Sequence, residues 1–486
     1  MIPDLAFSLC VILTSLLVNR TITAGPWFWT LILAFAALVI AGCGADLEAG
    51  SVIRVEVLAG IPETTAPPPT TTNTTTTIPA TRSRVGPTTT TRPFNPACVN
   101  RTPEPSRDSI AEVELAARIE TALEHPGFAG HDVSLSVWVD GWGEVITHNP
   151  HLELLPASNQ KLLVAIAANE TLDLTGPLRT QIELVDGDVV IRAGADPTLT
   201  FADLTEAFEA VVEHTGPDID RIVVDVSQFP QPTTAEGWRE TLVPMYVGPL
   251  SGFMVENNRW TSGEALNSDP ATANILRLIE LLPEQVMVNS VFVVDGESAP
   301  PPGELLVSIE SAPIESLVRT MLVSSDNQHA DLLLMELGRD GLSSGTLEDG
   351  AFVVERVLAA HCIPINGSIG DGSGLSRANF RSADAFVDAL STLHGTPEGD
   401  LLRSQMPIGG VSGTLARRFT GPYTGRVQAK TGTIRNSRAL TGWAAMANGR
   451  DAVFSIIVNS DPDEEVPTIG PALGAIDALV REILNT

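Results

Sequence analysis

The chain has 486 residues, of which 43% are apolar, and 29 cationic and 59 anionic side chains give it a formal net charge of −30. This length allows more than one domain, and the apolar content is that of a globular protein. The negative charge argues against nucleic acid and anionic membrane surfaces as partners, because both attract lysine and arginine.

Two apolar runs open the chain, at residues 5–18 and 26–42, with Arg20 between them. The second run has about the minimum length of a membrane-spanning helix. It ends in Leu-Val-Ile-Ala-Gly-Cys43, which resembles a bacterial lipobox whose cysteine becomes the lipidated N-terminus. Residues 1–45 are therefore expected to be a lipoprotein signal or a membrane anchor. Either one would attach the chain to the outer, extracytoplasmic face of the cytoplasmic membrane.

Residues 46–106 form a predicted disordered linker that is rich in threonine and proline, for example in Pro-Pro-Pro-Thr-Thr-Thr. Such a segment has few side chains to bury, so it cannot offset the entropy lost on ordering. We expect an extended tether between the anchor and a folded region that begins at residue 107.

The first folded part, 107–175, contains a predicted helix over 110–123 and a strand over 133–139. A turn at 141–143 leads into a partner strand, and a second helix starts at Ser158.

An inserted smaller domain is expected over 176–258, because Ser158 and Ser325, which belong to neighbouring motifs, lie too far apart in sequence for a loop. The interval between the two motifs shows a hairpin, helices and strands, which are predicted at residues 180–192, 203–214, 222–226, 271–282 and 288–294.

The second part of the main domain, 259–486, has predicted helices over 314–324, 328–338 and 470–484, and strands around 427–430, 439–446 and 452–458. A glycine-rich loop covers 371–377. Helices on either side of these strands indicate an α+β domain with an antiparallel sheet flanked by helices.

Only two lysines occur in the whole chain, Lys161 and Lys430, and every other cationic side chain is arginine. A desolvated lysine can lose its proton and act as a base, whereas arginine stays protonated. Ser158 lies three residues before Lys161, so both side chains would share one helix face. A neutral Lys161 is thus a candidate base for Ser158, with Lys430 as the second cation that would lower the pKa of Lys161.

Two further motifs follow along the chain. Ser325-Asp326-Asn327 offers a hydroxyl that can relay a proton to a leaving amine and an amide that can hold the lysine. The strand residues Lys430, Thr431, Gly432 and Thr433 offer a cation and two hydroxyls for a substrate carboxylate, and Gly432 allows close approach of a substrate backbone. The backbone N–H groups of Ser158 and Thr433 are predicted to stabilise an oxyanion.

Ser-x-x-Lys, Ser-Asp-Asn and Lys-Thr-Gly in this order form the motif set of penicillin-binding proteins and class A β-lactamases. Further matches support a closer resemblance, and they lie at 156–162, 195–199, 311–313, 371–379 and 406–414. Residues 107–486 resemble the D-alanyl-D-alanine carboxypeptidase/endopeptidase family of class C low-molecular-mass penicillin-binding proteins. The resemblance implies a β-lactamase/transpeptidase-like fold, peptidoglycan stem peptides as substrates, β-lactams as inhibitors and no cofactor or metal.

The same resemblance implies a role for each motif residue. Ser158 would be the acylated nucleophile and Lys161 its base, with Ser325 and Asn327 as proton relay and positioning groups. The carboxylate and oxyanion site would be formed by Lys430, Thr431 and Thr433.

The sequence leaves alternatives open. A penicillin-binding sensor would be acylated once and release no D-alanine. A β-lactamase-like serine hydrolase shares the motifs, although the Glu-x-x-Leu-Asn of class A enzymes is absent. The four cysteines, Cys10, Cys43, Cys98 and Cys362, lack metal-ligand spacing; Cys98 and Cys362 could form a disulfide or remain buried free thiols.

Overall fold

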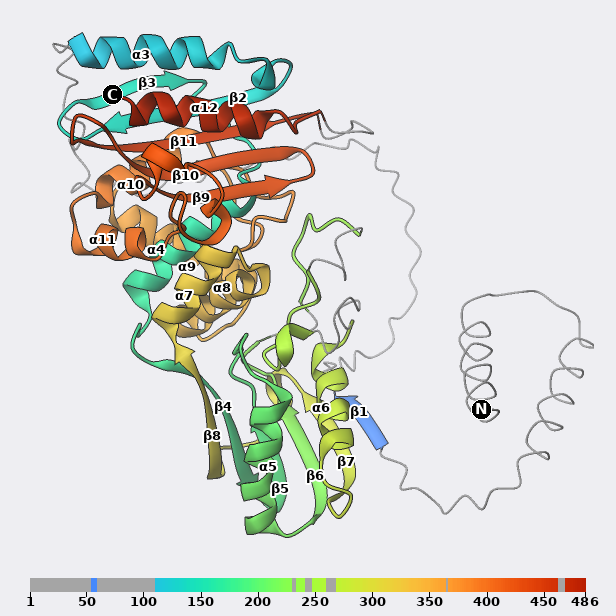
Figure 1. Ribbon diagram of the computed structural model, residues 1–486. Coiled ribbons are helices and arrows are strands. Elements are labelled where there is room, and N and C mark those ends of the chain that lie inside the picture. The colour runs from blue at the N-terminus through green and yellow to red at the C-terminus, as the bar shows by residue number, and fades with distance from the viewer. Residues whose placement is uncertain are drawn as a thin grey trace, which may run out of the picture. The chain divides into compact units, whose positions relative to one another are not determined.

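The computed structural model describes residues 54–58, 110–229, 233–240, 247–258, 268–363, 366–461 and 468–486 (Figure 1). The predicted anchor, Cys43 and the threonine-proline runs lie outside these residues. Within the described ranges, no helix is both long enough and apolar enough to span a membrane.

A five-stranded antiparallel sheet has the strand order β3-β2-β11-β10-β9. Its strands are β2 (Asp132–Val139), β3 (Gly143–His148), β9 (Val427–Ile434), β10 (Ser437–Ala445) and β11 (Asp451–Asn459). The two strands β10 and β11 are buried along nearly their whole length, and the residues of β11 from Ala452 to Val458 are apolar apart from Ser455. The sheet joins the first folded segment to the last third of the chain.

Helices cover both faces of this sheet, as the sequence predicted. On one face lie α3 (Ile110–Leu123) and α12 (Ala472–Leu484), which bury residues such as Leu115, Ile119 and Ile476 against it. The other face carries α4 (Gln160–Thr171), α7 (Ile314–Ser324), α8 (Asn327–Leu342), α9 (Leu347–Ala360), α10 (Ala383–Leu393) and α11 (Pro397–Ser404). Each fully buried Leu or Ile contributes about 1.5–3 kcal/mol, so this core is what holds the layers together.

Two helices of that second layer are buried almost all round. In α4 every residue from Gln160 to Ala168 is buried, and in α8 every residue from Gln328 to Gly338 is buried. A helix that is buried on all sides lies inside the domain, whatever polar residues it carries. Lys161 and Asp331 are therefore charged residues in the interior, and interior charges need specific partners.

A six-stranded mixed sheet has the order β1-β7-β6-β5-β4-β8. Its strands are β1 (Arg54–Leu58), β4 (Pro177–Val185), β5 (Asp188–Arg192), β6 (Asp218–Asp225), β7 (Met287–Val294) and β8 (Glu304–Pro313). The helices α5 (Phe201–Thr215) and α6 (Pro270–Leu281) share its apolar core. The predicted turn of the β4–β5 hairpin is present, with positive φ at Asp186 and Gly187 as a type I′ turn requires.

The extent of this sheet corrects two boundaries. The predicted end of the insert at residue 258 is wrong, because α6, β7 and β8 lie beyond it and still belong to the six-stranded sheet or its helix layer. Strand β8 is an edge strand with mostly exposed or half-buried side chains, so its sequence gives little apolar alternation. Within the predicted linker, Arg54–Leu58 is not disordered but forms β1, which pairs in parallel with β7.

Cys362 is disulfide-bonded, so the alternative of a buried free thiol at this position is wrong. The other three cysteines lie outside the described residues, and pairing with Cys98 stays a prediction.

Candidate active site

Ser158 lies in a single 3-10 turn, Ala157–Asn159, that runs directly into α4. Ala157 has a φ of 48°, a strained conformation for a residue with a Cβ, and such strain is concentrated at functional sites. The turn is fixed to the sheet because Asn159 Nδ2 donates a hydrogen bond of 2.7 Å to Thr441 Oγ1 on β10. Ser158 itself is 9% exposed, so its hydroxyl lies at the border between interior and surface.

Lys161 is completely buried one turn further along and holds three oxygen atoms with its amine. Its Nζ donates to Ser158 Oγ at 3.1 Å, to Asn327 Oδ1 at 2.9 Å and to the Ser373 carbonyl at 2.5 Å. Burial lowers the pKa of Lys161 to about 8, and the carboxylates of Asp331, Asp371 and Asp326 oppose that shift. A useful fraction of the amine is thus unprotonated near neutral pH and can accept a proton.

The Ser-Asp-Asn motif forms the sharp connection between α7 and α8. Ser325 adopts a left-handed conformation with φ 63°, and Asp326 caps α8 by accepting a hydrogen bond of 2.9 Å from the His329 backbone N–H. Asn327 is the first residue of α8. This turn presents Ser325 and Asn327 to different lysines, Ser325 to Lys430 and Asn327 to Lys161.

Lys430 approaches the site from β9 and is also completely buried. Its Nζ donates to Ser325 Oγ at 2.8 Å and to the Thr431 carbonyl at 2.9 Å. Burial and the charge of Lys161 hold the pKa of Lys430 well below its usual range. An anionic substrate group next to Lys430 would offset both effects.

Strand β9 is the edge strand of the five-stranded sheet and packs closely on the serine turn. At Gly432 an added Cβ would lie 2.7 Å from the Pro156 carbonyl oxygen, so only glycine allows this approach. Thr431 Oγ1 donates to Thr414 Oγ1 at 2.9 Å, and Thr433 is exposed. The strand therefore carries a cation and two hydroxyls along an edge that an extended peptide could join.

The structure thus brings the predicted residues Ser158, Lys161, Ser325, Asn327 and Lys430 together. Lys161 links Ser158 to Asn327, and Lys430 links Ser325 to β9.

Three contributors were not predicted, namely the Ser373 carbonyl and the carboxylates of Asp331 and Asp371. A backbone carbonyl has no signature in the sequence. Asp331 does have one, since it is the single acid in the otherwise apolar run Ala330–Met335 of α8, and a fully buried carboxylate is rare without a specific partner.

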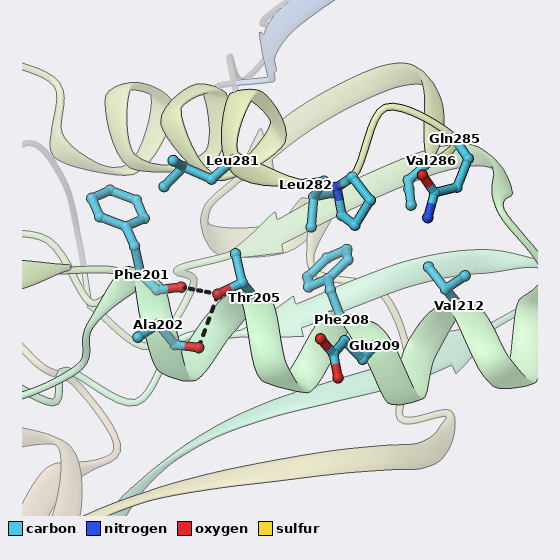
Figure 2. Close-up of a pocket in the computed structure, with 11 residues that line it drawn as sticks. Phe201, Ala202, Thr205, Phe208, Glu209, Val212, Leu281, Leu282, Gln285 and Val286 are labelled. Atoms are coloured by element: carbon cyan, nitrogen blue, oxygen red, sulfur yellow. Dashed lines mark hydrogen bonds between the residues drawn. The ribbon is translucent and has the colours of Figure 1, made fainter.

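A separate cavity of about 690 Å³ lies on the six-stranded sheet's helix layer, between α5 and the turn after α6 (Figure 2). Phe201, Phe208, Leu281 and other apolar side chains line most of it. Thr205 Oγ1 already donates to backbone carbonyls of its own helix, and Glu209 is the one titratable lining residue. This cavity contains none of the five motif residues and is not the candidate active site.

A serine beside a buried lysine, on a helix under a five-stranded antiparallel sheet, defines the class of serine enzymes that work through an acyl intermediate. The chain belongs to the D-Ala-D-Ala carboxypeptidase 3 (S13) family, whose sequence model matches residues 115–278 and 269–478. The predicted family, the α+β fold class and the serine carboxypeptidase class are thereby confirmed.

Curated relatives agree with this family. The D-alanyl-D-alanine carboxypeptidase of Actinomadura sp. (strain R39) is 28% identical over 441 residues, covering 71% of this chain and 81% of the relative. The carboxypeptidase DacB of Mycolicibacterium smegmatis is 28% identical over 395 residues, covering 76% and 84%.

The fold is also that of a solved structure, penicillin binding protein 4 (dacB) from Haemophilus influenzae. The two superpose with a TM-score of 0.67 at 20% identity, over 76% of this chain and 99% of that one. A second structure of the Haemophilus protein, with a TM-score of 0.62, is a complex with a β-lactam.

Proposed function

We propose that Ser158 is the nucleophile of a D-Ala-D-Ala carboxypeptidase and that Lys161 is its general base. The observation that carries this proposal is the 3.1 Å hydrogen bond from the completely buried Lys161 Nζ to Ser158 Oγ, which lies at the border of the interior. Burial lowers the lysine pKa to about 8, so the amine can take the hydroxyl proton as Oγ attacks a peptide carbonyl carbon.

The second lysine would bind the end of the substrate. A peptide that ends in D-alanine presents a carboxylate, and Lys430 with Thr431 and Thr433 offers a cation and two hydroxyls for it. The ammonium form of Lys430 is costly because it is buried without an anionic partner in the part of the chain that the structure describes. A bound substrate carboxylate would supply that partner. A neutral C-terminal amide would be disfavoured.

Ser325 would pass a proton to the leaving amine. In acylation the Ser158 Oγ–C bond forms, the peptide C–N bond breaks, and the departing nitrogen of the terminal D-alanine needs a proton. Ser325 Oγ lies 2.8 Å from Lys430 Nζ, so its own proton can be replaced from that amine. After the amine has left, the Lys161 ammonium gives its proton to solvent, which in turn restores the proton of Lys430. The neutral Lys161 amine then takes a proton from the attacking water and passes it to Ser158 Oγ as the acyl C–O bond breaks.

Substrates of this kind are the stem peptides of peptidoglycan, and β-lactams would acylate Ser158 as inhibitors. The names of the carboxypeptidase relatives and the β-lactam complex of the Haemophilus protein support this assignment. The test is to incubate the protein with a muramyl pentapeptide and with cross-linked peptidoglycan, and to identify the products by mass spectrometry. Release of D-alanine supports a carboxypeptidase, and cleaved cross-links support an endopeptidase. A single acylation by penicillin without D-alanine release would favour a sensor, and rapid release of hydrolysed penicillin would favour a β-lactamase.

The site of action would be outside the cytoplasm, because peptidoglycan lies there. We propose attachment to the membrane through the apolar run at 26–42 or through a lipid on Cys43. Mass spectrometry of the mature N-terminus separates the two. A diacylated Cys43 peptide indicates a lipoprotein, and an intact 26–42 peptide indicates a helical anchor.

A further inference from the structure

Asp331 lies on α8, one turn after Asn327, and is completely buried. Its Oδ1 accepts hydrogen bonds from the backbone N–H groups of Gly372 at 2.9 Å and Ser373 at 2.8 Å. Its Oδ2 is buried and has no hydrogen-bond partner among the described residues. A carboxylate oxygen in this state is costly, so another interaction has to explain why an acid occupies this position.

The residue that Asp331 holds through its N–H is the one whose carbonyl contacts the candidate base. Ser373 gives its N–H to Asp331 and receives Lys161 Nζ on its carbonyl oxygen at 2.5 Å. Asp331 thus fixes the peptide unit before Ser373, and Asp371 fixes the one that carries the Ser373 carbonyl by accepting from Gly374 N–H at 2.7 Å. The carbonyl in turn decides where the lysine amine points, because it is one of the three oxygen atoms around it.

Asp371 fixes the rest of the same loop. Its carboxylate accepts hydrogen bonds from Ser373 Oγ at 2.9 Å, Gly374 N at 2.7 Å and Ser376 N at 2.8 Å. Trp238 Nε1, from the segment 233–240, donates to the same carboxylate at 2.7 Å. The loop also packs on the serine turn, since a Cβ on Gly374 would lie 1.9 Å from the Ala157 carbonyl oxygen. There is thus little room for the Ser373 carbonyl to turn away.

Asp331 also acts on Lys161 through its charge. Burial and the neighbouring Asp371 raise the pKa of Asp331 well above its usual range, and the charge of Lys161 lowers it. The carboxylate form of Asp331 and the ammonium form of Lys161 therefore stabilise each other. Asp371 and Asp326 are the other charged groups that raise the pKa of the same amine, and the charge of Lys161 in turn lowers the pKa of the neighbouring Lys430.

We propose that Asp331 is a positioning residue for acylation. It holds Ser373 by its N–H and so, together with Asp371, keeps in place the carbonyl that accepts from the Lys161 amine beside the Ser158 hydroxyl. It also supplies the buried negative charge that stabilises the ammonium formed when the Ser158 proton arrives. This inference rests on the proposed roles of Ser158 and Lys161. It assigns a function to a carboxylate that does not itself touch the substrate.

The test is the rate of acylation by a fluorescent penicillin between pH 5.5 and 10, for the full chain and its Asp331→Asn variant. Asparagine keeps an oxygen for the two backbone N–H groups but carries no charge. We expect the acid limb of the profile to move to lower pH by about one unit, because the ammonium form of Lys161 loses a partner. We also expect the plateau rate to fall several-fold, because a weaker base accepts the proton less readily.

If Asp331 had a purely structural role, its replacement would lower the plateau rate of acylation without shifting the acid limb of the pH profile. An unshifted limb in Asp331→Asn therefore overturns the proposal. The Asp331→Glu variant keeps the charge and should keep the limb in place while lowering the plateau; a limb that moves in this variant also overturns it. Asp331→Glu can therefore still overturn the proposal if Asp331→Asn fails to fold, because its limb has to stay in place.

Glu336→Gln is the matched control. Glu336 is also a buried acid of α8, 3% exposed and paired with Arg339, and it is not among the carboxylates that act on Lys161. The Glu336→Gln substitution should leave both the acid limb of the pH profile and the plateau rate of acylation unchanged. If the unchanged protein is not acylated at Ser158, the proposed function fails; if it is acylated normally and Asp331→Asn shows no shift, only the role of Asp331 fails.

Discussion

The Nζ atom of Lys430 lies 2.8 Å from Ser325 Oγ, although the two residues are 105 positions apart in the chain. This contact ties the edge strand β9 to the turn between α7 and α8. It also brings Lys430 close enough to Lys161 for the charge of one lysine to lower the pKa of the other. Both lysines of the chain thus belong to one buried site, in which a neutral amine is favoured over two adjacent cations.

Replacing Lys161 with arginine should lower the rate of acylation by penicillin by about a thousandfold, within the usual range for loss of a general base. The guanidinium group keeps its proton, so it cannot accept one from Ser158. Stopped-flow fluorescence with a labelled penicillin measures this rate. Lys430→Arg serves as the comparison, because it keeps the charge that a carboxylate needs and should lose less. A normal acylation rate in Lys161→Arg would show that another group is the base.

The acylation rate of the unaltered protein should rise with pH and reach half of its maximum near pH 8. The sign follows from the pKa of about 8 for Lys161, since the base form is scarce below this pH and dominant above it. Between pH 6 and 7 the rate should increase about tenfold, as expected for loss of one proton. A limb centred near pH 4 would instead point to a carboxylate as the base.

Ser325→Ala should slow hydrolysis of a D-Ala-D-Ala peptide by about ten- to a hundredfold, because the leaving amine loses its proton donor. A thioester substrate of the same acyl group should be affected much less, since a thiolate leaves without a proton. The ratio of kcat/KM values for the two substrates measures the effect. An equal loss on both would mean that Ser325 supports the site in some other way than as a proton relay.

Much of the candidate site could be predicted because its chemistry is tied to residue type. Lys161 and Lys430 stand out in a chain whose every other cationic side chain is arginine, and Ser158 is identified by its position three residues before Lys161. The hydrogen bonds of Lys161 and Lys430 agree with that prediction. The Ser373 carbonyl could not be predicted, since its position depends on how Asp331 and Asp371 hold a loop from within the folded interior.

In the fold, too, the buried elements could be predicted from the sequence and the largely exposed ones could not. The interior helix α4 and the buried strand β11 could be predicted from their largely apolar sequences. Helix α11 could not, because only Gly399 and Leu402 of its eight residues are buried. The same holds for the edge strand β8, whose side chains are mostly exposed or half-buried.

Gly432→Ala should reduce acylation at least tenfold and destabilise the protein by about 1–3 kcal/mol, as overpacking does. The new methyl group would lie 2.7 Å from the Pro156 carbonyl oxygen and 3.2 Å from Ala157 Cβ, so β9 and the serine turn would have to separate. Thermal unfolding and acylation rates measure both effects. Gly474→Ala, on the exposed side of α12 with no atom within 4 Å of the new Cβ, should leave the acylation rate unchanged. Normal acylation in Gly432→Ala would contradict the close packing described here.

The most direct test of the catalytic assignment is to locate the covalent adduct. The protein is labelled with penicillin, digested and sequenced by tandem mass spectrometry, in parallel with Ser158→Ala. We predict one acyl adduct on the Ser158 hydroxyl and no labelling of the alanine variant. An adduct on Ser325, on Thr431 or on any other hydroxyl, or undiminished labelling of Ser158→Ala, would contradict the account.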